Sequence, residues 1–366
     1  MSWLPVRGLF SAEGDIHRSC VSCARLLEGA KVRFNSRWVT GVAVGAMLLS
    51  TASFGVGVAA QGATKHKAYK VAYLSYALAN SYDAPMLAAA KAVAAADGVK
   101  VTVFDAGNSY TTQVSQLQDV INSGQYQGVI TQPIYGAALI PTVKKAIKKG
   151  IKVVNIDQIL GTKYTTDQIQ VAGLSGNVVF FPSKIGTQLA TLANKACAGA
   201  SPCQIGLIHN FQGYEPDAAV TAAFKTQLAT YSNDSIVAEA DGLYTISASL
   251  TDAQDMLVAH SGINVIVGSD QNCEGAQSAL TAAKNTTVKL VCYGASAAGL
   301  TAIKSGAWFA DVAQAPASEG QLGMIALVKA VKTGKKSGSQ NPVAALPNHG
   351  VLTLSNVSKF TAEWPG

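Results

Sequence analysis

Short runs of apolar and β-branched residues alternate with alanine-rich amphipathic stretches from Tyr69 to the C-terminus. This alternation is typical of parallel βαβ units, in which a helix of about 10–15 residues returns the chain to the start of the next strand. The pattern predicts strands over Lys70–Leu74, Lys100–Phe104, Gly128–Thr131, Lys152–Ile156, Gln170–Gly173, Gln204–Ile208, Ser235–Ala240, Asn264–Val267, Val288–Tyr293 and Trp308–Val312. Helices are expected between these strands.

The alternation runs to Asp157, changes character over residues 163–177 and then resumes. We therefore expect an α/β protein with two doubly wound parallel sheets rather than one closed barrel. In such sheets, ligands bind beyond the carboxyl ends of the strands, so the residues that follow each strand are the ones to examine.

Proline and glycine mark the expected helix ends. Pro85 and Pro141 are each expected to open a helix, with Asp83 as the N-cap of the first. Gly98 and Gly150 are expected to end the helices that follow.

Near the N-terminus, the stretch Trp38–Ala60 carries no charge and consists of apolar or small residues, and it follows three basic residues, Lys31, Arg33 and Arg37. It ends in small residues at the positions that a signal peptidase reads. We expect an N-terminal extension and a secretory signal over residues 1–60, with cleavage after Ala60, and an uncleaved membrane anchor is the alternative. Translation is expected to begin near Val32, which would bring the basic residues close to the start.

Composition and charge narrow the function classes. With 49% apolar residues, the chain is not wholly disordered. Its net charge is +7, yet no arginine occurs from Gln61 onward. Because arginine supplies most bidentate contacts to bases and phosphates, we expect no nucleic-acid partner.

Four cysteines follow the signal, an even number in a chain that we expect to reach an oxidising compartment. Cys197 and Cys203 bracket a short loop and are expected to bridge each other, and Cys273 and Cys292 form the second candidate pair. Neither pair has a histidine at metal-ligand spacing, so we expect structural disulfides and no metal.

Catalytic patterns are missing from the sequence. The histidines after the signal form no pair at i and i+4, and no Gly-x-Ser-x-Gly or Walker pattern occurs. Gly-x-Gly occurs only at Gly55–Gly57, inside the predicted signal, which argues against a dinucleotide cofactor. We expect a protein that is not an enzyme and has no cofactor. His209, at a strand end, is interpreted as a core or loop histidine.

Amides, hydroxyls, aromatic rings and single carboxylates follow the predicted strands. This mixture suits a small neutral polyhydroxy ligand, whose hydroxyls donate and accept hydrogen bonds and whose C–H faces pack on rings. A charged ligand would need a matching bidentate cation, and arginine is missing. For any one of these residues, a capping or turn role is the alternative.

Several of these stretches carry a family resemblance: Lys70–Tyr82, Val153–Asp157, Val265–Asp270 with Gly275–Ala276, and Asp311–Pro316. On them the chain resembles periplasmic sugar-binding proteins of the ribose-binding type, the solute receptors of ABC importers. The resemblance implies the type I periplasmic binding fold, with two lobes joined by a three-strand hinge. Lobe one would comprise residues 68–172 and 315–345, and lobe two residues 173–314 and 346–366.

Four family positions carry over directly. By resemblance, Asn80 is the ligand-binding amide, Tyr82 the stacking ring, Asp157 the carboxylate that binds sugar hydroxyls, and Gln314 the hinge amide. The candidate ligand-binding residues as a set are Asn80, Tyr82, Asp83, Tyr135, Asp157, Gln158, Tyr214, Asp217, Tyr244, Ser269, Asp270 and Gln314.

The chain departs from the family pattern at several other positions. Gln158 stands where arginine is frequent, and the second-lobe arginine is replaced near Asp217 and Ala218. Ser269 stands where asparagine is usual, and Ala295 replaces an aspartate. A polyol or modified sugar is therefore expected, with tyrosines filling the vacated space.

The resemblance implies an exported receptor that closes around a sugar or polyol and delivers it to a membrane permease. We expect a monomer. The alternatives are a sensory receptor of the same fold for a small signal molecule and, less favoured, an exported enzyme.

Overall fold

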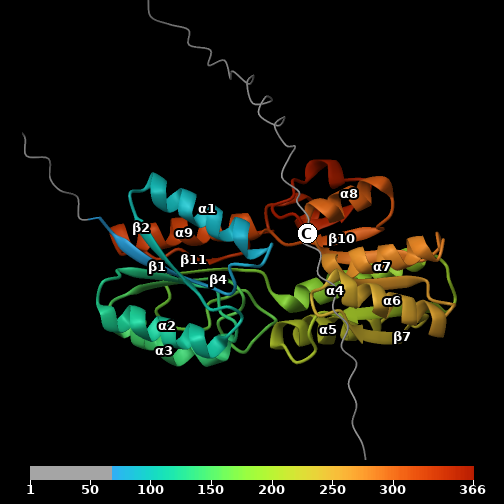
Figure 1. The fold of residues 1–366 in the computed structure, drawn as a ribbon, viewed down its shortest axis with the longest axis horizontal. Coiled ribbons are helices and arrows are strands. Elements are labelled where there is room, and N and C mark those ends of the chain that lie inside the picture. The colour runs from blue at the N-terminus through green and yellow to red at the C-terminus, as the bar shows by residue number, and fades with distance from the viewer. Residues whose placement is uncertain (1–67) are drawn as a thin grey trace, which may run out of the picture. The chain divides into compact units, whose positions relative to one another are not determined.

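The computed structural model describes residues 68–366, which form two sheets flanked by helices (Figure 1). The first sheet has the strand order β11-β5-β4-β3-β1-β2, and every neighbouring pair is parallel. Its strands are β1 (Lys70–Ser75), β2 (Lys100–Asp105), β3 (Gly128–Thr131), β4 (Lys152–Asp157), β5 (Gly176–Val179) and β11 (Gly338–Gln340).

The second sheet has the order β12-β10-β9-β8-β6-β7. It is parallel except at its edge, where β12 runs antiparallel to β10 and Asp311 lies opposite Leu352. Its strands are β6 (Cys203–His209), β7 (Asp234–Asp241), β8 (Val265–Ser269), β9 (Lys289–Gly294), β10 (Ala310–Ala313) and β12 (Val351–Thr353). Two lobes with parallel α/β sheets are thus confirmed, with this one antiparallel edge strand added.

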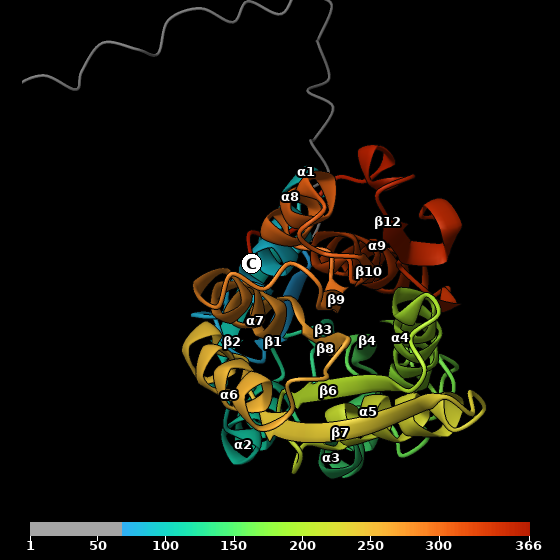
Figure 2. The ribbon, with the colours of Figure 1, turned by 90° about the vertical axis from the view of Figure 1, so that its right-hand side faces the viewer.

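Helices cover both faces of each sheet (Figure 2). In the first lobe α1 and α9 pack on one face, and α2 and α3 on the other. In the second lobe α4 and α5 cover one face, and α6, α7 and α8 the other. The helices are α1 (Asp83–Ala96), α2 (Tyr110–Ser123), α3 (Gly136–Lys148), α4 (Pro182–Cys197), α5 (Glu215–Leu228), α6 (Ile246–Ala259), α7 (Asp270–Ala282), α8 (Ala297–Ser305) and α9 (Pro316–Thr333), with short 3₁₀ turns at Pro347–Gly350 and Val357–Lys359.

The strand sequences explain why helices pack on both faces of each sheet. In β1, Val71 and Tyr73 pack into the cluster under α1 and α9, whereas Ala72 and Leu74 pack into the cluster under α2 and α3. All four side chains are fully buried. A central parallel strand with two buried faces reads as a continuous apolar run, which is the pattern seen here.

The chain passes between the lobes three times: between β5 and α4, between β10 and α9, and between β11 and β12. The predicted strand over Gln170–Gly173 is wrong. That segment is a loop that buries Val171 beneath the first sheet, and the strand follows it at β5. The first sheet therefore extends past residue 172.

Two predicted helix signals need correction. Pro141 does not open α3 but lies inside it, since the helix begins at Gly136. Asp83 is the first residue of α1 rather than a side-chain N-cap, because its carboxylate is bound by Gln132 instead. Gly98 and Gly150 do follow the helix ends, each in the left-handed region that glycine tolerates.

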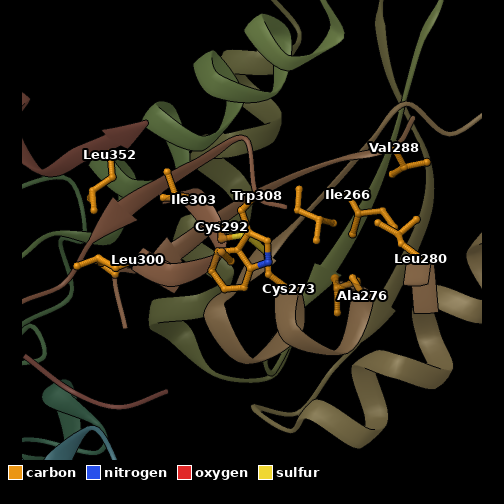
Figure 3. Packing of buried hydrophobic residues seen from close by; sticks show 14 of the residues in the cluster. Ile266, Cys273, Ala276, Leu280, Val288, Cys292, Leu300, Ile303, Trp308 and Leu352 are labelled. Atoms are coloured by element: carbon orange, nitrogen blue, oxygen red, sulfur yellow. A yellow bond between two sulfur atoms is a disulfide. The ribbon is translucent and has the colours of Figure 1, made fainter. Parts of the chain in front are cut away.

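The structure contains both predicted disulfides. Cys197 and Cys203, at the end of α4 and the start of β6, have Cα atoms 5.8 Å apart. Cys273 of α7 and Cys292 of β9 have Cα atoms 6.2 Å apart, and they lie in the second-lobe core beside Trp308 (Figure 3). Asp234 lies near the first pair, but sulfurs already joined to each other are not available as thiolate ligands.

The predicted signal and its cleavage position lie outside residues 68–366. Within that range, no helix is both long enough and apolar enough to cross a membrane.

Candidate ligand-binding site between the lobes

Three tyrosines meet where the carboxyl ends of the two sheets face each other. Tyr135, between β3 and α3, and Tyr214, between β6 and α5, have ring centroids 5.9 Å apart at an interplanar angle of 79°. Tyr76, directly after β1, packs edge-on against the same Tyr214 ring at 6.4 Å. Tyr214 is only 7% exposed, so a second-lobe ring is enclosed by first-lobe rings.

Beside these rings, one amide holds two first-lobe carboxylates. Gln132, which follows β3, donates from Nε2 to Asp83 Oδ1 at 2.5 Å and to Asp157 Oδ2 at 3.0 Å. Its Oε1 accepts from the backbone N–H of Tyr76 at 3.0 Å. Since an amide nitrogen carries two hydrogens, both carboxylate bonds form together. Asp83 and Asp157 are 3% and 2% exposed, so the pair is held in a nearly dry environment.

Burial dominates the acidity of both carboxyl groups. Burial and, after it, the charge of Asp157 raise the pKa of Asp83 to about 7, against the donation from Gln132, which lowers it. Burial also raises the pKa of Asp157 to about 6, while hydrogen bonds from Gln132 and Gln158 act in the opposite direction. Asp83 Oδ2 is buried and has no hydrogen-bond partner among residues 68–366.

The second lobe contributes a third carboxyl group, Asp217 in the first turn of α5. It is 6% exposed, and its Oδ1 accepts from the Tyr244 hydroxyl at 2.7 Å. Burial raises the pKa of Asp217 to about 7. Within the described part of the chain its Oδ2 is buried without a partner. The Tyr244 ring itself is 44% exposed, so only its hydroxyl end is tied into the site.

On the second-lobe side of the site, two asparagines form a chain of hydrogen bonds with a tyrosine. Asn272 donates from Nδ2 to Asn210 Oδ1 at 2.9 Å, and Asn210 donates in turn to the Tyr293 hydroxyl. The space beside Asn210, Asp217 and Tyr293 measures about 20 Å³. This volume holds about one water molecule and not a sugar. Its lining comes from the second lobe alone, and the contact between the lobes is made by the Tyr214 ring against Tyr76 and Tyr135.

We call Tyr76, Asp83, Gln132, Tyr135, Asp157, Asn210, Tyr214 and Asp217 the interlobe site. It unites five predicted residues: Asp83, Tyr135, Asp157, Tyr214 and Asp217. Gln158 and Tyr244, also predicted, contact it through Asp157 and Asp217.

The other predicted residues have partners elsewhere. Asn80 is exposed, and its Oδ1 accepts from the backbone N–H of Tyr82 at 2.8 Å in a local turn. The Tyr82 ring packs edge-on against Trp364 at 5.5 Å. Gln314 lies at the crossing from β10 to α9, where its backbone N–H donates to Gly294 O at 3.3 Å.

Ser269 and Asp270 organise the second lobe. Ser269 caps α7 with its hydroxyl. Asp270 is fully buried and accepts from the backbone N–H of Ser296 at 2.7 Å. Burial raises the pKa of Asp270 and also that of its neighbour Asp311. Ligand roles for these two predicted residues, and for Asn80, Tyr82 and Gln314, remain predictions.

Sequence reasoning did not select Tyr76, Gln132, Asn210 or Tyr293. Only their positions could have identified them: Tyr76, Gln132 and Asn210 directly follow a strand, and Tyr293 lies within one. His209 agrees with its interpretation as a core histidine, since its buried side chain contacts Glu239 Oε2 at 2.7 Å.

A larger hollow of about 560 Å³ lies on the second lobe between α7 and α8. Its lining includes Ile246, Glu274, Ser278 and Thr301, and it contains none of the residues of the interlobe site. The residues of the two sheets' carboxyl ends converge at the interlobe site instead, where parallel α/β sheets bind their ligands.

Comparison with known proteins identifies the family to which this two-lobed fold belongs. A family model described as a periplasmic binding protein domain matches residues 71–336. The D-allose-binding periplasmic protein of Escherichia coli is 27% identical over 252 residues, which cover 65% of this chain and 76% of that protein.

Solved structures share the fold. A solute-binding protein of an ABC transporter from Bacillus halodurans, with bound myo-inositol, superposes with a TM-score of 0.69 at 19% identity, covering 81% of this chain and 98% of that one. An ABC transporter periplasmic protein from Actinobacillus succinogenes, with bound D-allose, gives 0.67 at 19%, covering 80% and 100%. The chain belongs to the periplasmic binding protein family and has the two-lobed fold of its type I members.

Proposed function

We propose that this protein is the solute-binding receptor of an ABC importer and that it binds a sugar or sugar-like polyol between its lobes. The observation that carries the proposal is the interlobe site, in which one amide holds Asp83 and Asp157 beside rings from both lobes. Buried carboxylates accept hydrogen bonds from hydroxyl groups, and tyrosine rings pack against the C–H faces of a sugar. The bound sugars and polyols of its structural relatives support the same class.

The lack of arginine argues against an anionic ligand. No arginine follows Gln61, and the salt bridges of the described residues involve only His209, Lys225, Lys332, Glu239 and Asp97. An anion in the interlobe site would face three carboxyl groups with no cation to pair with it. The ligand is therefore a neutral polyhydroxy compound or one that carries positive charge.

Ligand entry requires the lobes to separate. The buried Tyr214 ring of the second lobe packs against Tyr76 and Tyr135 of the first, so it fills the contact between the lobes. We propose that the three crossings act as a hinge, with Gln314 in the second of them. A ligand that binds the closed arrangement more tightly than the open one shifts the lobes toward closure.

The proposal includes the receptor's surroundings. The family implies a periplasmic location, and we propose export by the N-terminal signal with cleavage after Ala60. The closed receptor, a monomer, would dock on a membrane permease. Members of the family are binding proteins, and we propose no catalytic step for this chain.

A thermal-shift screen of the purified protein tests the proposal. Pentoses, hexoses, polyols and amino acids are compared, because a ligand that binds only the folded state raises the unfolding midpoint. We expect a rise of several degrees with at least one polyhydroxy compound, and loss of that rise in Asp157→Asn. Ser278→Tyr, which puts a ring into the hollow between α7 and α8, is the matched control and should respond like the wild type. A response lost only in Ser278→Tyr would move the site to that hollow.

A further inference from the structure

The carboxyl groups of the interlobe site have no cationic partner. Asp83, Asp157 and Asp217 are all more than nine-tenths buried, and none forms a salt bridge among residues 68–366. Nearby, the fully buried Glu319 of α9 has no hydrogen-bond partner for either oxygen within the same range. Buried carboxyl groups are normally paired, because an isolated buried charge is costly.

Two carboxylate oxygens of the interlobe site lack hydrogen-bond partners. Asp83 Oδ2 in the first lobe and Asp217 Oδ2 in the second are buried and without partners in the described chain. Their sister oxygens are bound by Gln132 and Tyr244, so both side chains are fixed in place. Nearby donors lower the pKa of these groups, namely the Ala77 backbone N–H for Asp83, and the Phe211 backbone N–H and Asn210 side chain for Asp217, but none forms a hydrogen bond to either Oδ2 atom. The site thus offers two acceptor oxygens without a partner.

The negative charge of both lobes converges on the same rings. Asp157 of the first lobe and Asp217 of the second both raise the pKa values of the Tyr76 and Tyr214 hydroxyls. With Tyr135, these rings form a continuous edge-to-face cluster. The faces of aromatic rings attract cations, so the rings and the carboxyl groups favour the same kind of charge.

We propose that the ligand of this site is a polyhydroxy compound that carries a protonated amine, such as an aminosugar or an amino polyol. The inference rests on the proposed receptor function and narrows its ligand class. An ammonium group has three donors and no acceptor, which matches the unpartnered carboxylate oxygens. The hydroxyl groups of the same ligand would form hydrogen bonds with Asp157, Gln158 and Asn210. The lack of arginine argues against an anionic ligand. It also leaves the carboxyl groups of the site without a cationic side chain to pair with.

Binding of an ammonium group carries a proton signature that a neutral sugar lacks. Burial gives the three carboxyl groups pKa values of about 6 to 7, so they are partly protonated near neutral pH. A cation beside them lowers these pKa values and expels protons. The groups that act on the pKa values of the three, or share those influences, are acids or tyrosines: Asp105, Asp241, Glu319, Tyr73, Tyr76, Tyr82, Tyr214, Tyr244 and Tyr293. One histidine, His209, lines the same small space as Asp217, and its ring contacts Glu239.

The test compares matched amine and parent compounds by titration calorimetry of the whole protein at pH 7. The pairs are glucosamine with glucose, galactosamine with galactose, and 1-amino-1-deoxyglucitol with glucitol. We expect at least one amine to bind tenfold or more tightly than its parent and to release protons, seen as a heat that changes with the ionisation enthalpy of the buffer. In Asp217→Asn the amine-to-parent affinity ratio should fall at least fivefold. Glu274→Gln, in the hollow between α7 and α8, should keep the ratio.

Two results would overturn the inference, and they have different meanings. If the neutral parent compounds bind as tightly as their amines and no protons are released, the preference for an amine is refuted, and the proposed function as a sugar receptor is unaffected. No binding by either series would refute both. If Asp217→Asn fails to fold by far-UV circular dichroism, Asp157→Asn takes its place in the same comparison.

Discussion

Replacing Asp217 by asparagine should make the protein more stable at pH 8, although it removes a residue of the proposed site. Burial raises the pKa of Asp217 from 3.8 to about 7, so above pH 7 the folded protein must ionise a group that the unfolded chain ionises easily. A shift of about three units corresponds to roughly 4 kcal/mol at 1.36 kcal/mol per unit. Asparagine avoids this cost and can still accept from Tyr244.

The sign follows from proton linkage. Between pH 4 and pH 7 the folded state holds more protons at Asp217 than the unfolded state does, so stability falls as the pH rises through this window. Integrating from pH 5 to pH 8 gives about 2.5 kcal/mol of penalty in the wild type that the variant does not carry. Below pH 4, Asp217 is protonated in both states and the difference between the two proteins should be small.

Urea unfolding, followed by Trp308 and Trp364 fluorescence, measures this difference at pH 5 and pH 8. We expect Asp217→Asn to gain about 1–4 kcal/mol over the wild type at pH 8 and clearly less at pH 5. Asp255→Asn, on the exposed face of α6, is the control and should stay within about 0.5 kcal/mol. A variant less stable than the wild type at pH 8, or two proteins with parallel pH profiles, would refute the reasoning.

Three further predictions concern packing and closure. Trp364→Ala removes a buried ring that packs on Tyr82, and should lower the free energy of unfolding by about 3–5 kcal/mol; an effect below 1 kcal/mol in urea unfolding would contradict it. Replacing Cys273 and Cys292 together by alanine opens a loop with a sequence separation of 19 and should cost about 3 kcal/mol, and an unchanged unfolding midpoint would argue against a stabilising bridge. Tyr214→Ala removes the ring between the lobes and should increase the radius of gyration of the free protein in small-angle scattering; identical curves would show that Tyr214 does not hold the lobes together.

Much of the fold was predictable because its central strands are buried on both faces. Val71 to Leu74 form a continuous apolar run, and such runs need no tertiary information to be recognised. β5 was misplaced because it opens with Gly176 and Asn177, residues that favour turns, while Val171 just before it is buried in a loop. The short polar edge strand β11 has no apolar pattern at all.

The site was predictable only in part, for a related reason. Asp157 and Asp217 could be chosen because they follow predicted strands and lie at or near positions that the family resemblance marks. Gln132 could not be distinguished from any other amide after a strand, since its importance comes from two carboxylates that lie 49 and 25 residues away along the chain. Tyr82 is assigned to the ligand by family resemblance, and its contact with Trp364 could not be foreseen because Trp364 lies at the far end of the sequence.

Titration calorimetry with the best compound of the thermal-shift screen tests the central claim most directly, namely that a polyhydroxy ligand binds at the interlobe site. We predict saturable one-to-one binding to the wild type, at least tenfold weaker binding to Asp157→Asn, and unchanged binding to Ser278→Tyr. Equal affinity in the wild type and in Asp157→Asn, with loss of binding in Ser278→Tyr, would contradict the account.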